Sequence, residues 1–551
     1  MTLATLPVVP APTPESGQAH QEWWRGAVVY QVYPRSFADS NGDGVGDLNG
    51  ITAHLDHVAS LGVDAVWISP FYTSPMKDFG YDVADYCDVD PVFGTLADFD
   101  RLVEKAHGLG LKVIVDQVWS HTSDQHEWFK ASRQDRTNPH ADWYVWADAK
   151  ADGSPPNNWQ SVFGGPGWTW DARRGQYYQH NFLPEQPQLN GRHPAVQDAL
   201  LAAGRFWLDR GVDGFRLDAI NFMINDPSLK DNPAFPAGGK RTRPFDFQDK
   251  IYNQSHPDIA PFLERVRALT DSYGDGRFTV AEVGGDHADR EMKEYTADDR
   301  HLHSAYGFLY LYAERMLADL VQTGAAMWPG AQGEDGQGEG WPSWTFSNHD
   351  APRAISRWAE GRNERQLAEM LMLLLVSLRG NVFVYYGEEL GLPQGEVPFD
   401  RLVDPEAIAN WPQTLGRDGA RTPMPWTADA PFAGFSSVEP WLPVDARHPA
   451  LAVDVQNADP KSMLNATRRI LALRRACPAL RIGEMTVLTT APVLTFTREG
   501  GGEALLAAFN LGHEAQDWTA PAGYAVVDSV NLSQAGVLPP LGGVLLRKEA
   551  G

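Results

Sequence analysis

Residues 212–220 read VDGFRLDAI, a short and mostly apolar run with two charged residues, Arg216 and Asp218, in its second half. A run of this length, with glycine beside it, is typical of a strand that is buried on both faces of a parallel sheet. Charged side chains directly after such a strand are costly to bury without partners. The stretch therefore predicts a parallel strand with functional polar side chains at its carboxyl end.

Similar runs recur along the chain, and helix-like segments separate them. The other predicted strands are residues 28–37, 63–71, 112–121, 277–283, 343–350 and 381–388, with 304–311 the weakest pattern. The predicted helices are residues 51–61, 96–109, 194–209, 259–272 and 364–378. This β/α alternation in a chain of 551 residues predicts an α/β fold, a (β/α)8 TIM barrel.

Three segments do not follow the barrel pattern. Residues 122–188, after the third strand, are rich in Trp, Asn, Pro and Gly and predict an inserted subdomain. Residues 481–551 contain short alternating apolar segments and predict a C-terminal antiparallel β-domain. Residues 1–22 contain several prolines and predict a flexible tail. The barrel is then formed by residues 23–121 and 189–480.

The composition restricts the partners. The 46 Lys and Arg stand against 71 Asp and Glu, a net charge of −25, which disfavours nucleic acid and anionic membranes. No apolar run reaches the roughly 18 residues of a membrane span. The two cysteines, Cys87 and Cys477, favour a reducing compartment and a cytoplasmic protein. A neutral small molecule remains the expected partner, and the oligomeric state stays open between monomer and homodimer.

Polar residues lie at the carboxyl ends of four of the predicted strands. They are Asp116 with His121, Arg216 with Asp218, Glu282, and His349 with Asp350. Active sites of TIM barrels lie at the carboxyl ends of the strands, so these groups are expected to converge on one site. Asp116 is expected to be a structural hydrogen-bonding group there.

These segments, DQVWSH, GFRLDAINF, FTVAEV and FSNHD, resemble the signature regions of the α-amylase family, glycoside hydrolase family 13. The closest resemblance is to its α-glucosidase and oligo-1,6-glucosidase branch. It extends to WWRGAVVYQVYPRSFADSNGDGVGDLNGI at 23–51, GYDVADY at 80–86 and GRDGARTPMPW at 416–426. It covers nearly the whole chain after Trp23.

The resemblance implies roles for three carboxylates. Asp218 is expected to be the nucleophile, Glu282 the general acid/base, and Asp350 a transition-state stabiliser that also binds sugar hydroxyls. A retaining glycosidase needs this division of labour, and its acid must hold a proton near neutral pH. Arg216 is expected to keep Asp218 ionised and oriented.

The resemblance also implies residues that bind the sugar. Asp82 and Arg417 are expected to hold the far hydroxyls of a terminal glucose, with Arg421 as the alternative to Arg417. Tyr81 is expected to stack beneath this glucose. The remaining expected contacts are His121, His349, Phe163, Phe182 and Gln186. For His121, Phe163 and Phe182 a purely structural role stays open.

Residues 39–47 read DSNGDGVGD, which matches the start of a calcium loop. Relatives in the glucosidase branch use such a loop for a cation, so a structural Ca²⁺ or Mg²⁺ is expected. The expected ligands are Asp39, Asn41, Asp43, Asp47 and the Val45 carbonyl. Gly50 replaces the glutamate of an EF-hand, and a set of Asx-turns is the alternative. No organic cofactor is expected, because no glycine pair has phosphate-binding spacing.

The function implied by this resemblance is a retaining, exo-acting α-glucosidase on short α-glucosides. Ala219, after the expected nucleophile, favours α-1,4 linkages or sucrose over α-1,6 linkages. Residues 225–245 are expected to form a loop that restricts the aglycone side. Two alternatives stay open: a dedicated transglucosidase or sucrose isomerase, and a non-catalytic binding partner.

Overall fold

The computed structural model describes residues 22–549 except 237–242, 275, 299, 329–339, 413–415, 533 and 535. The predicted tail at 1–22 therefore lies almost wholly outside the described residues. None of the described helices is long and apolar enough to cross a membrane.

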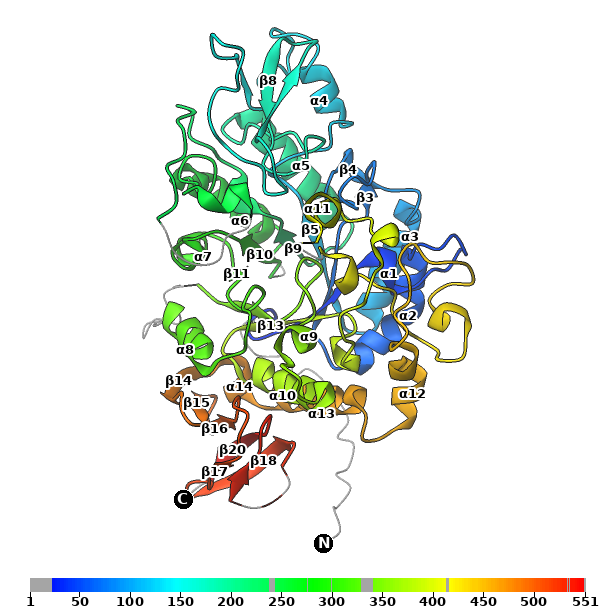
Figure 1. Cartoon of the computed structure of the whole chain (residues 1–551), viewed down its shortest axis with the longest axis vertical. Helices are drawn as coiled ribbons and strands as arrows, with labels where there is room; N and C mark the ends of the chain where they lie inside the picture. Colours follow the sequence, from blue (N-terminus) through cyan, green and yellow to red (C-terminus); the bar gives the residue numbers. More distant parts are fainter. Residues whose placement is uncertain are drawn as a thin grey trace.

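Eight parallel strands form the centre of the molecule (Figure 1). They are β1 (Val28–Val32), β2 (Ala65–Ile68), β5 (Lys112–Gln117), β9 (Gly214–Leu217), β10 (Phe278–Val283), β11 (Ser304–Gly307), β12 (Ser343–Thr345) and β13 (Asn381–Tyr385). Their order is β11-β10-β9-β5-β2-β1-β13-β12. A parallel bridge between Ala305 and Pro342 joins the two outer strands, so the sheet nearly closes. The predicted TIM barrel is confirmed.

Helices surround this sheet. Those predicted are α2 (Leu48–Ser60), α3 (Leu96–Gly108), α5 (Pro194–Asp209), α6 (Ala260–Asp271) and α10 (Glu364–Ser377). Three more were not predicted: α7 (Ala288–Thr296), α8 (Ala318–Met327) and α9 (Ala354–Trp358). The pattern of α7 is weak because its buried side carries Glu291 and Thr296 beside Met292 and Tyr295. Short helices α1 (Pro34–Phe37), α11 (Pro405–Asn410) and α12 (Val453–Ala458) lie in the connections.

The insertion after β5 is a small antiparallel unit, seen at the top of Figure 1. It contains α4 (Glu127–Ser132), β6 (Trp146–Ala147), β7 (Trp168–Asp171) and β8 (Gln176–Gln179). An antiparallel bridge between His121 and Gln188 joins its two ends. Beside it lies a short hairpin of β3 (Tyr72–Thr73) and β4 (Asp85–Val89). The insertion therefore leaves and re-enters the barrel at one place, above the carboxyl ends of the strands.

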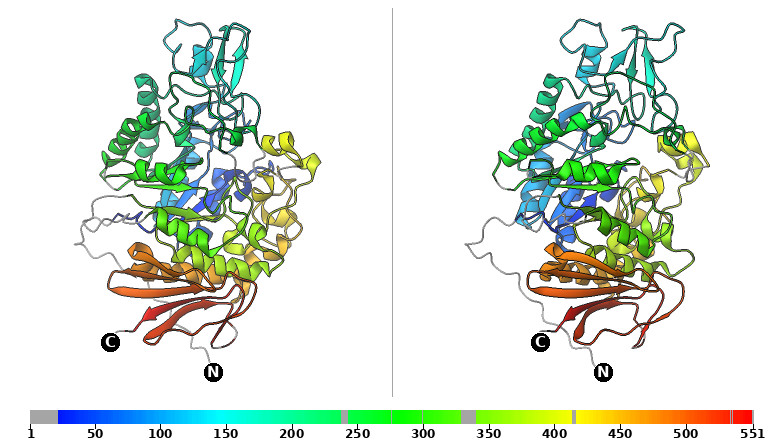
Figure 2. Two further views of the ribbon diagram at one scale, coloured as in Figure 1. Left: turned by 60° about the vertical axis from the view of Figure 1, so that its left-hand side comes forward. Right: turned by 90° about the vertical axis from the view of Figure 1, so that its left-hand side faces the viewer.

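The C-terminal β-domain lies at the opposite end of the molecule (Figure 2). After α13 (Met463–Ala476) and α14 (Pro478–Ile482) come β14 (Glu484–Thr489), β15 (Leu494–Gly500), β16 (Glu503–Phe509), β18 (Tyr524–Val530) and β20 (Gly543–Lys548). They form one antiparallel sheet in the order β14-β15-β16-β20-β18. The short strands β17 (Gln516–Asp517) and β19 (Val537–Leu538) pair separately. This confirms the predicted antiparallel domain.

Candidate active site

A cavity of about 320 Å³ opens at the carboxyl ends of the barrel strands. Its size lies at the lower end of the roughly 300–1,000 Å³ usual for small-molecule sites. Asp218, Glu282 and Asp350 all line it, so the three predicted carboxylates share one space. The other predicted residues on its wall are Tyr81, His121, Phe163, Phe182, Gln186 and Arg417, together with Ala219.

Arg216 holds the carboxylates together from beneath. Its Nη1 lies 2.5 Å from Asp218 Oδ1 and 2.7 Å from Asp116 Oδ1, and its Nη2 lies 2.5 Å from Glu282 Oε1. The register explains this arrangement, because Asp116 on β5 lies directly beside Arg216 on β9. The guanidinium is fully buried, so it acts as a fixed charge that positions both carboxyl groups.

Two of the carboxyl groups titrate near neutral pH. Burial raises the pKa of Glu282 to about 7; Arg216 opposes this shift, and Asp218 and Asp350 add to it. Burial likewise raises the pKa of Asp218 to about 7 against the pull of Arg216. Two interacting groups of this kind can share one proton near neutrality. Glu282 Oε2 accepts a hydrogen bond from the Ala219 N–H at 3.1 Å, which fixes its orientation.

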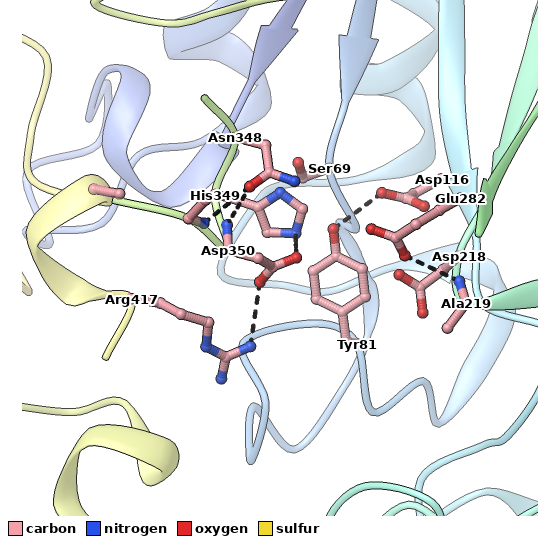
Figure 3. A network of polar contacts seen from close by, with 12 residues as sticks. Ser69, Tyr81, Asp116, Asp218, Ala219, Glu282, Asn348, His349, Asp350 and Arg417 are labelled. Carbon is pink, nitrogen blue, oxygen red and sulfur yellow. Dashed lines mark hydrogen bonds and ion pairs between the residues drawn. The ribbon is translucent and has the colours of Figure 1, made fainter. Parts of the chain in front are cut away.

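Asp350 has a different environment (Figure 3). Arg421 Nη2 lies 2.9 Å and Arg417 Nη1 3.4 Å from its Oδ1, and His349 Nε2 lies 3.1 Å from its Oδ2. Burial raises the pKa of Asp350, but His349 and the two arginines outweigh burial and hold the pKa well below its usual range. Asp350 therefore stays ionised while Glu282 can carry a proton.

His349 itself lies behind the wall of the cavity. It is fully buried and is not among the described residues that line the space. Its Nδ1 lies 2.8 Å from Gln31 Nε2, an amide donor, so the ring proton is on Nε2, which lies 3.1 Å from Asp350 Oδ2 but is not aligned for a hydrogen bond. The Tyr81 ring stacks on it with centroids 5.1 Å apart and planes 5° apart. In this structure His349 stacks on Tyr81 and lies close to Asp350, and its expected contact with sugar hydroxyls stays a prediction.

The inner end of the cavity is closed by a charged cluster. Arg417 Nη2 donates to Asp78 Oδ1 and to Asp404 Oδ1, both at 2.8 Å. Gln186 Nε2 donates to Asp78 Oδ2 at 3.1 Å. Asp78 and Arg417 line the cavity, whereas Arg421 lies behind Asp350. Arg417, rather than its alternative Arg421, therefore reaches the space that a sugar can occupy.

The prediction for Asp82 is wrong. Its carboxylate accepts hydrogen bonds from the Ser74 hydroxyl and from the backbone N–H groups of Lys77 and Asp78. It is fully buried within its own turn and is not among the described residues that line the cavity. Asp78, four residues earlier, faces the cavity instead, because the turn at Phe79–Gly80 reverses the chain between the two aspartates.

Tyr81 and His121 form one side of the cavity. The Tyr81 hydroxyl donates to Asp116 Oδ2 at 3.0 Å, which fixes the ring plane. His121 Nε2 lies 2.9 Å from the Tyr81 carbonyl oxygen and is buried. Asp116 is fully buried and bonds Arg216 and Tyr81, so it has the structural role that the sequence predicted.

Aromatic rings cover the outer side of the cavity. They are Phe163, Phe182, Phe222, Phe245, Phe308 and Tyr312. Arg417 lies 5.1 Å over the Phe163 ring, and Phe308 stacks on Tyr312 at 4.7 Å. Phe163 and Phe182 thus line the cavity. The other four were not predicted; Phe222 and Phe245 lie in short 3-10 helices, and Phe308 and Tyr312 follow β11.

The rim combines charges of both signs from distant loops. Arg243 bonds Asp246 at 3.0 Å and lies 3.6 Å from Glu406 of α11, and Lys250 lies 2.9 Å from Asp286. Arg243 and Phe245 belong to the end of the predicted mouth loop at 225–245; residues 237–242 lie outside the described residues. Charges of opposite sign therefore pair across the rim.

The loop at 39–47 winds through successive Asx-turns. Asp39 accepts hydrogen bonds from the N–H groups of Gly42 and Gly44, and Asp43 Oδ1 accepts one from Val45 N–H. Asp47 accepts from Gly50 N–H and thereby caps α2. Within the described part of the chain, no group of three or more His, Cys, Asp or Glu side chains could hold a metal ion. The oxygens of Asp39, Asn41 and Asp43 nevertheless share one tight turn, and Asn41 Nδ2 lies 3.2 Å from Asp43 Oδ2.

Comparison with known proteins agrees with this geometry. The family model "Alpha amylase, catalytic domain" matches residues 31–483. A probable alpha-glucosidase of Rhizobium meliloti (strain 1021) is 51% identical over 508 residues, 90% of each chain. An oligo-1,6-glucosidase of Parageobacillus thermoglucosidasius is 36% identical over 525 residues, 89% of this chain and 91% of that one.

A solved structure of the alpha-glucosyl transfer enzyme XgtA is similar over 96% of this chain and 100% of that one, with a TM-score of 0.91 and 51% identity. The residues matched by the family model, 31–483, contain all three carboxylates. The chain therefore belongs to the α-amylase family of glycoside hydrolases, in its α-glucosidase and oligo-1,6-glucosidase branch, and it is an α-glucosidase.

Proposed function

We propose that this enzyme removes one terminal, non-reducing glucose from short α-glucosides with retention of anomeric configuration. The observation that carries the proposal is the single guanidinium of Arg216, which contacts both Asp218 and Glu282. A retaining enzyme needs two carboxyl groups close enough to act on one anomeric centre, roughly 5–5.5 Å apart. Two carboxyl groups that contact one planar guanidinium lie close to each other, which supports the proposal.

The proposed reaction has two steps. Asp218 attacks the anomeric carbon while protonated Glu282 gives its proton to the leaving oxygen, so the glycosidic bond breaks and a glucosyl ester forms. Glu282, now ionised, then takes a proton from the incoming hydroxyl, which displaces Asp218 and restores both groups. Ionised Asp350 stabilises the positive charge that develops on the sugar ring in each step.

The closed inner end supports removal of a single glucose. Asp78, Arg417 and Gln186 join into one hydrogen-bonded cluster there, and a longer chain cannot pass through it. Paired charged groups at this position suit the hydroxyls of a terminal sugar, because they offer both donors and acceptors. An open-cleft enzyme would need this end to be open.

The linkage preference rests on Ala219. It lines the cavity next to the nucleophile and has a left-handed backbone with φ of 40°. A β-branched residue fits poorly in this conformation, so a small side chain suits the site. With Ala219 in place we propose α-1,4 linkages or sucrose as the preferred substrates over α-1,6 linkages.

Transfer of glucose to another hydroxyl is the second candidate. Two observations favour it: the aromatic outer side of the cavity, and the similarity to a protein described as an alpha-glucosyl transfer enzyme. An apolar acceptor site raises the chance that a bound alcohol reaches the glucosyl ester before water does.

The non-catalytic alternative has lost its support, because all three carboxylates line one cavity.

Initial rates on maltose, sucrose, isomaltose and p-nitrophenyl α-glucoside test the proposal, with and without an added alcohol acceptor. We expect maltose or sucrose to be cleaved faster than isomaltose. With the acceptor present, we expect glucosylated alcohol among the products. The Asp218→Asn variant should lose activity on all four substrates. Faster cleavage of isomaltose would contradict the linkage assignment, and an active Asp218→Asn variant would contradict the mechanism.

A further inference from the structure

A second cavity of about 280 Å³ lies at the amino-terminal end of the barrel, away from the three carboxylates. Helix α8 forms one wall and strand β14 of the C-terminal domain forms the other, and Figure 1 shows these two elements side by side. Pro342 just before β12 and Trp344 within it, together with Leu378 and Arg379 before β13, form its floor. No residue of the active-site cavity lines it.

Two buried donors in this wall have no acceptor among the described residues. Arg379 is 6% exposed, and its Nη2 has no hydrogen-bond partner in the described structure. Its Nε lies 3.3 Å from Glu484 Oε2 but is not aligned for a hydrogen bond. Trp328 is 4% exposed, and its indole N–H is likewise without a partner among the described residues. Buried donors without partners are rare in proteins and point to a ligand or a water that accepts from them.

The rest of the wall indicates the chemistry of that ligand. Trp328, Trp344 and Tyr310 supply aromatic surface, and Gln322, Thr486 and Glu484 supply polar atoms at the edge. Arg379 and Glu484 balance each other in charge, so an anion would have to compete with Glu484 for the guanidinium. A neutral molecule with several hydroxyls accepts from the two donors, donates to Glu484 and lays C–H surface on the rings.

We propose that this cavity is a second binding site for a neutral sugar of one or two rings. The site is independent of catalysis, since it shares no residue with the first cavity. It places a sugar between the barrel and the C-terminal domain, in contact with both.

Methionine methyl NMR tests the proposal directly, because Met485 lines the cavity and no methionine lines the active-site cavity within the described residues. Full-length Asp218→Asn enzyme with labelled methionine methyl groups is titrated with maltose, which this variant is expected to leave intact. The Met485 signal, identified through Met485→Leu, is expected to shift and to saturate. Sodium acetate and sodium phosphate at equal ionic strength are expected to leave it in place.

A variant that fills the cavity with a larger side chain is compared with the same substitution elsewhere on the surface. Ala325→Phe on α8 places a ring in the cavity and should abolish the shift, whereas Ala202→Phe, at an exposed position of α5, should preserve it. Arg379→Met removes the guanidinium donors and leaves the Trp328 N–H, and it should raise the maltose concentration at half-saturation at least tenfold. The proposal is overturned if maltose leaves the signal in place, if the shift survives in Ala325→Phe, or if phosphate or acetate shifts it and maltose does not.

Discussion

Asp78 illustrates what a sequence motif leaves open at the scale of single residues. The segment KDFGYDVADY contains Asp78 and Asp82 four positions apart, and both follow the same strand. Only the turn between them decides which carboxylate faces the cavity and which accepts hydrogen bonds from the turn itself. The partners Asp404 and Glu406 were missed for a related reason, since they lie in a long irregular segment without a periodic pattern.

The contrast between these two aspartates is testable. Asp78→Asn removes the charge that Arg417 contacts, and we expect kcat/KM on maltose to fall roughly 100-fold, as for loss of a charged hydrogen bond worth about 3 kcal/mol. Asp82→Asn should lower the melting temperature and leave KM close to wild type. Equal losses of kcat/KM with unchanged stability in both variants would place Asp82 in the site after all.

The pH dependence of the reaction follows from Glu282 and Asp218. Burial raises the pKa of each to about 7, and the active form has one proton, on Glu282. Above this pH the acid loses its proton, and below it the nucleophile gains one, so kcat/KM on maltose should be bell-shaped with its maximum near neutrality. Steady-state kinetics across the pH range, with circular dichroism to show an intact fold, provide the measurement. A rate that stays flat into the alkaline range would show that Glu282 is not the acid.

At the scale of elements, most barrel strands were predictable because they are short apolar runs buried on both faces, whereas β11, SAYG, gave the weakest pattern. The same reasoning located α10, whose residues from Leu367 to Ser377 are almost all buried. It missed α7, α8 and α9, whose apolar faces are narrow or short. The strands were predicted to extend too far at their carboxyl ends, because polar residues such as His121 and Asp350 lie in the loops that follow the strands.

The 39–47 loop is an element whose cation remains a prediction. It connects α1 to α2, and Asp39 also accepts a hydrogen bond from the Ser436 hydroxyl, 397 positions away in the chain. A bound cation would stabilise this junction in the folded state only. We expect Ca²⁺ to raise the melting temperature of EDTA-treated enzyme, and Asp43→Ala to abolish the increase. Identical melting curves with and without Ca²⁺ or Mg²⁺ would favour Asx-turns alone.

At the scale of the whole molecule, the barrel and the C-terminal domain share buried contacts. Arg498 on β15 is fully buried, and its Nη1 donates to the carbonyl oxygens of Ser377 and Leu378, both at 2.8 Å. Its Nη2 donates to the Gly483 carbonyl at 2.8 Å. One side chain therefore satisfies three carbonyls across the junction, which predicts that the two domains unfold together.

Calorimetry of Arg498→Met tests this coupling. Loss of three buried hydrogen bonds is expected to cost about 3 kcal/mol or more and to lower the single melting transition. Arg475→Met, at an exposed position of α13, should melt like the wild type. Two separate transitions in the wild-type enzyme would show that the domains are independent.

The central claim is that Asp218 and Glu282, gathered by Arg216, act on one anomeric carbon in two displacements. Proton NMR during the first seconds of maltose hydrolysis tests it most directly, because the anomers of released glucose give separate signals before they equilibrate. The non-reducing glucose of maltose should appear first as the α-anomer, in excess over its equilibrium share. First appearance of that glucose as the β-anomer would show a single displacement and contradict the account.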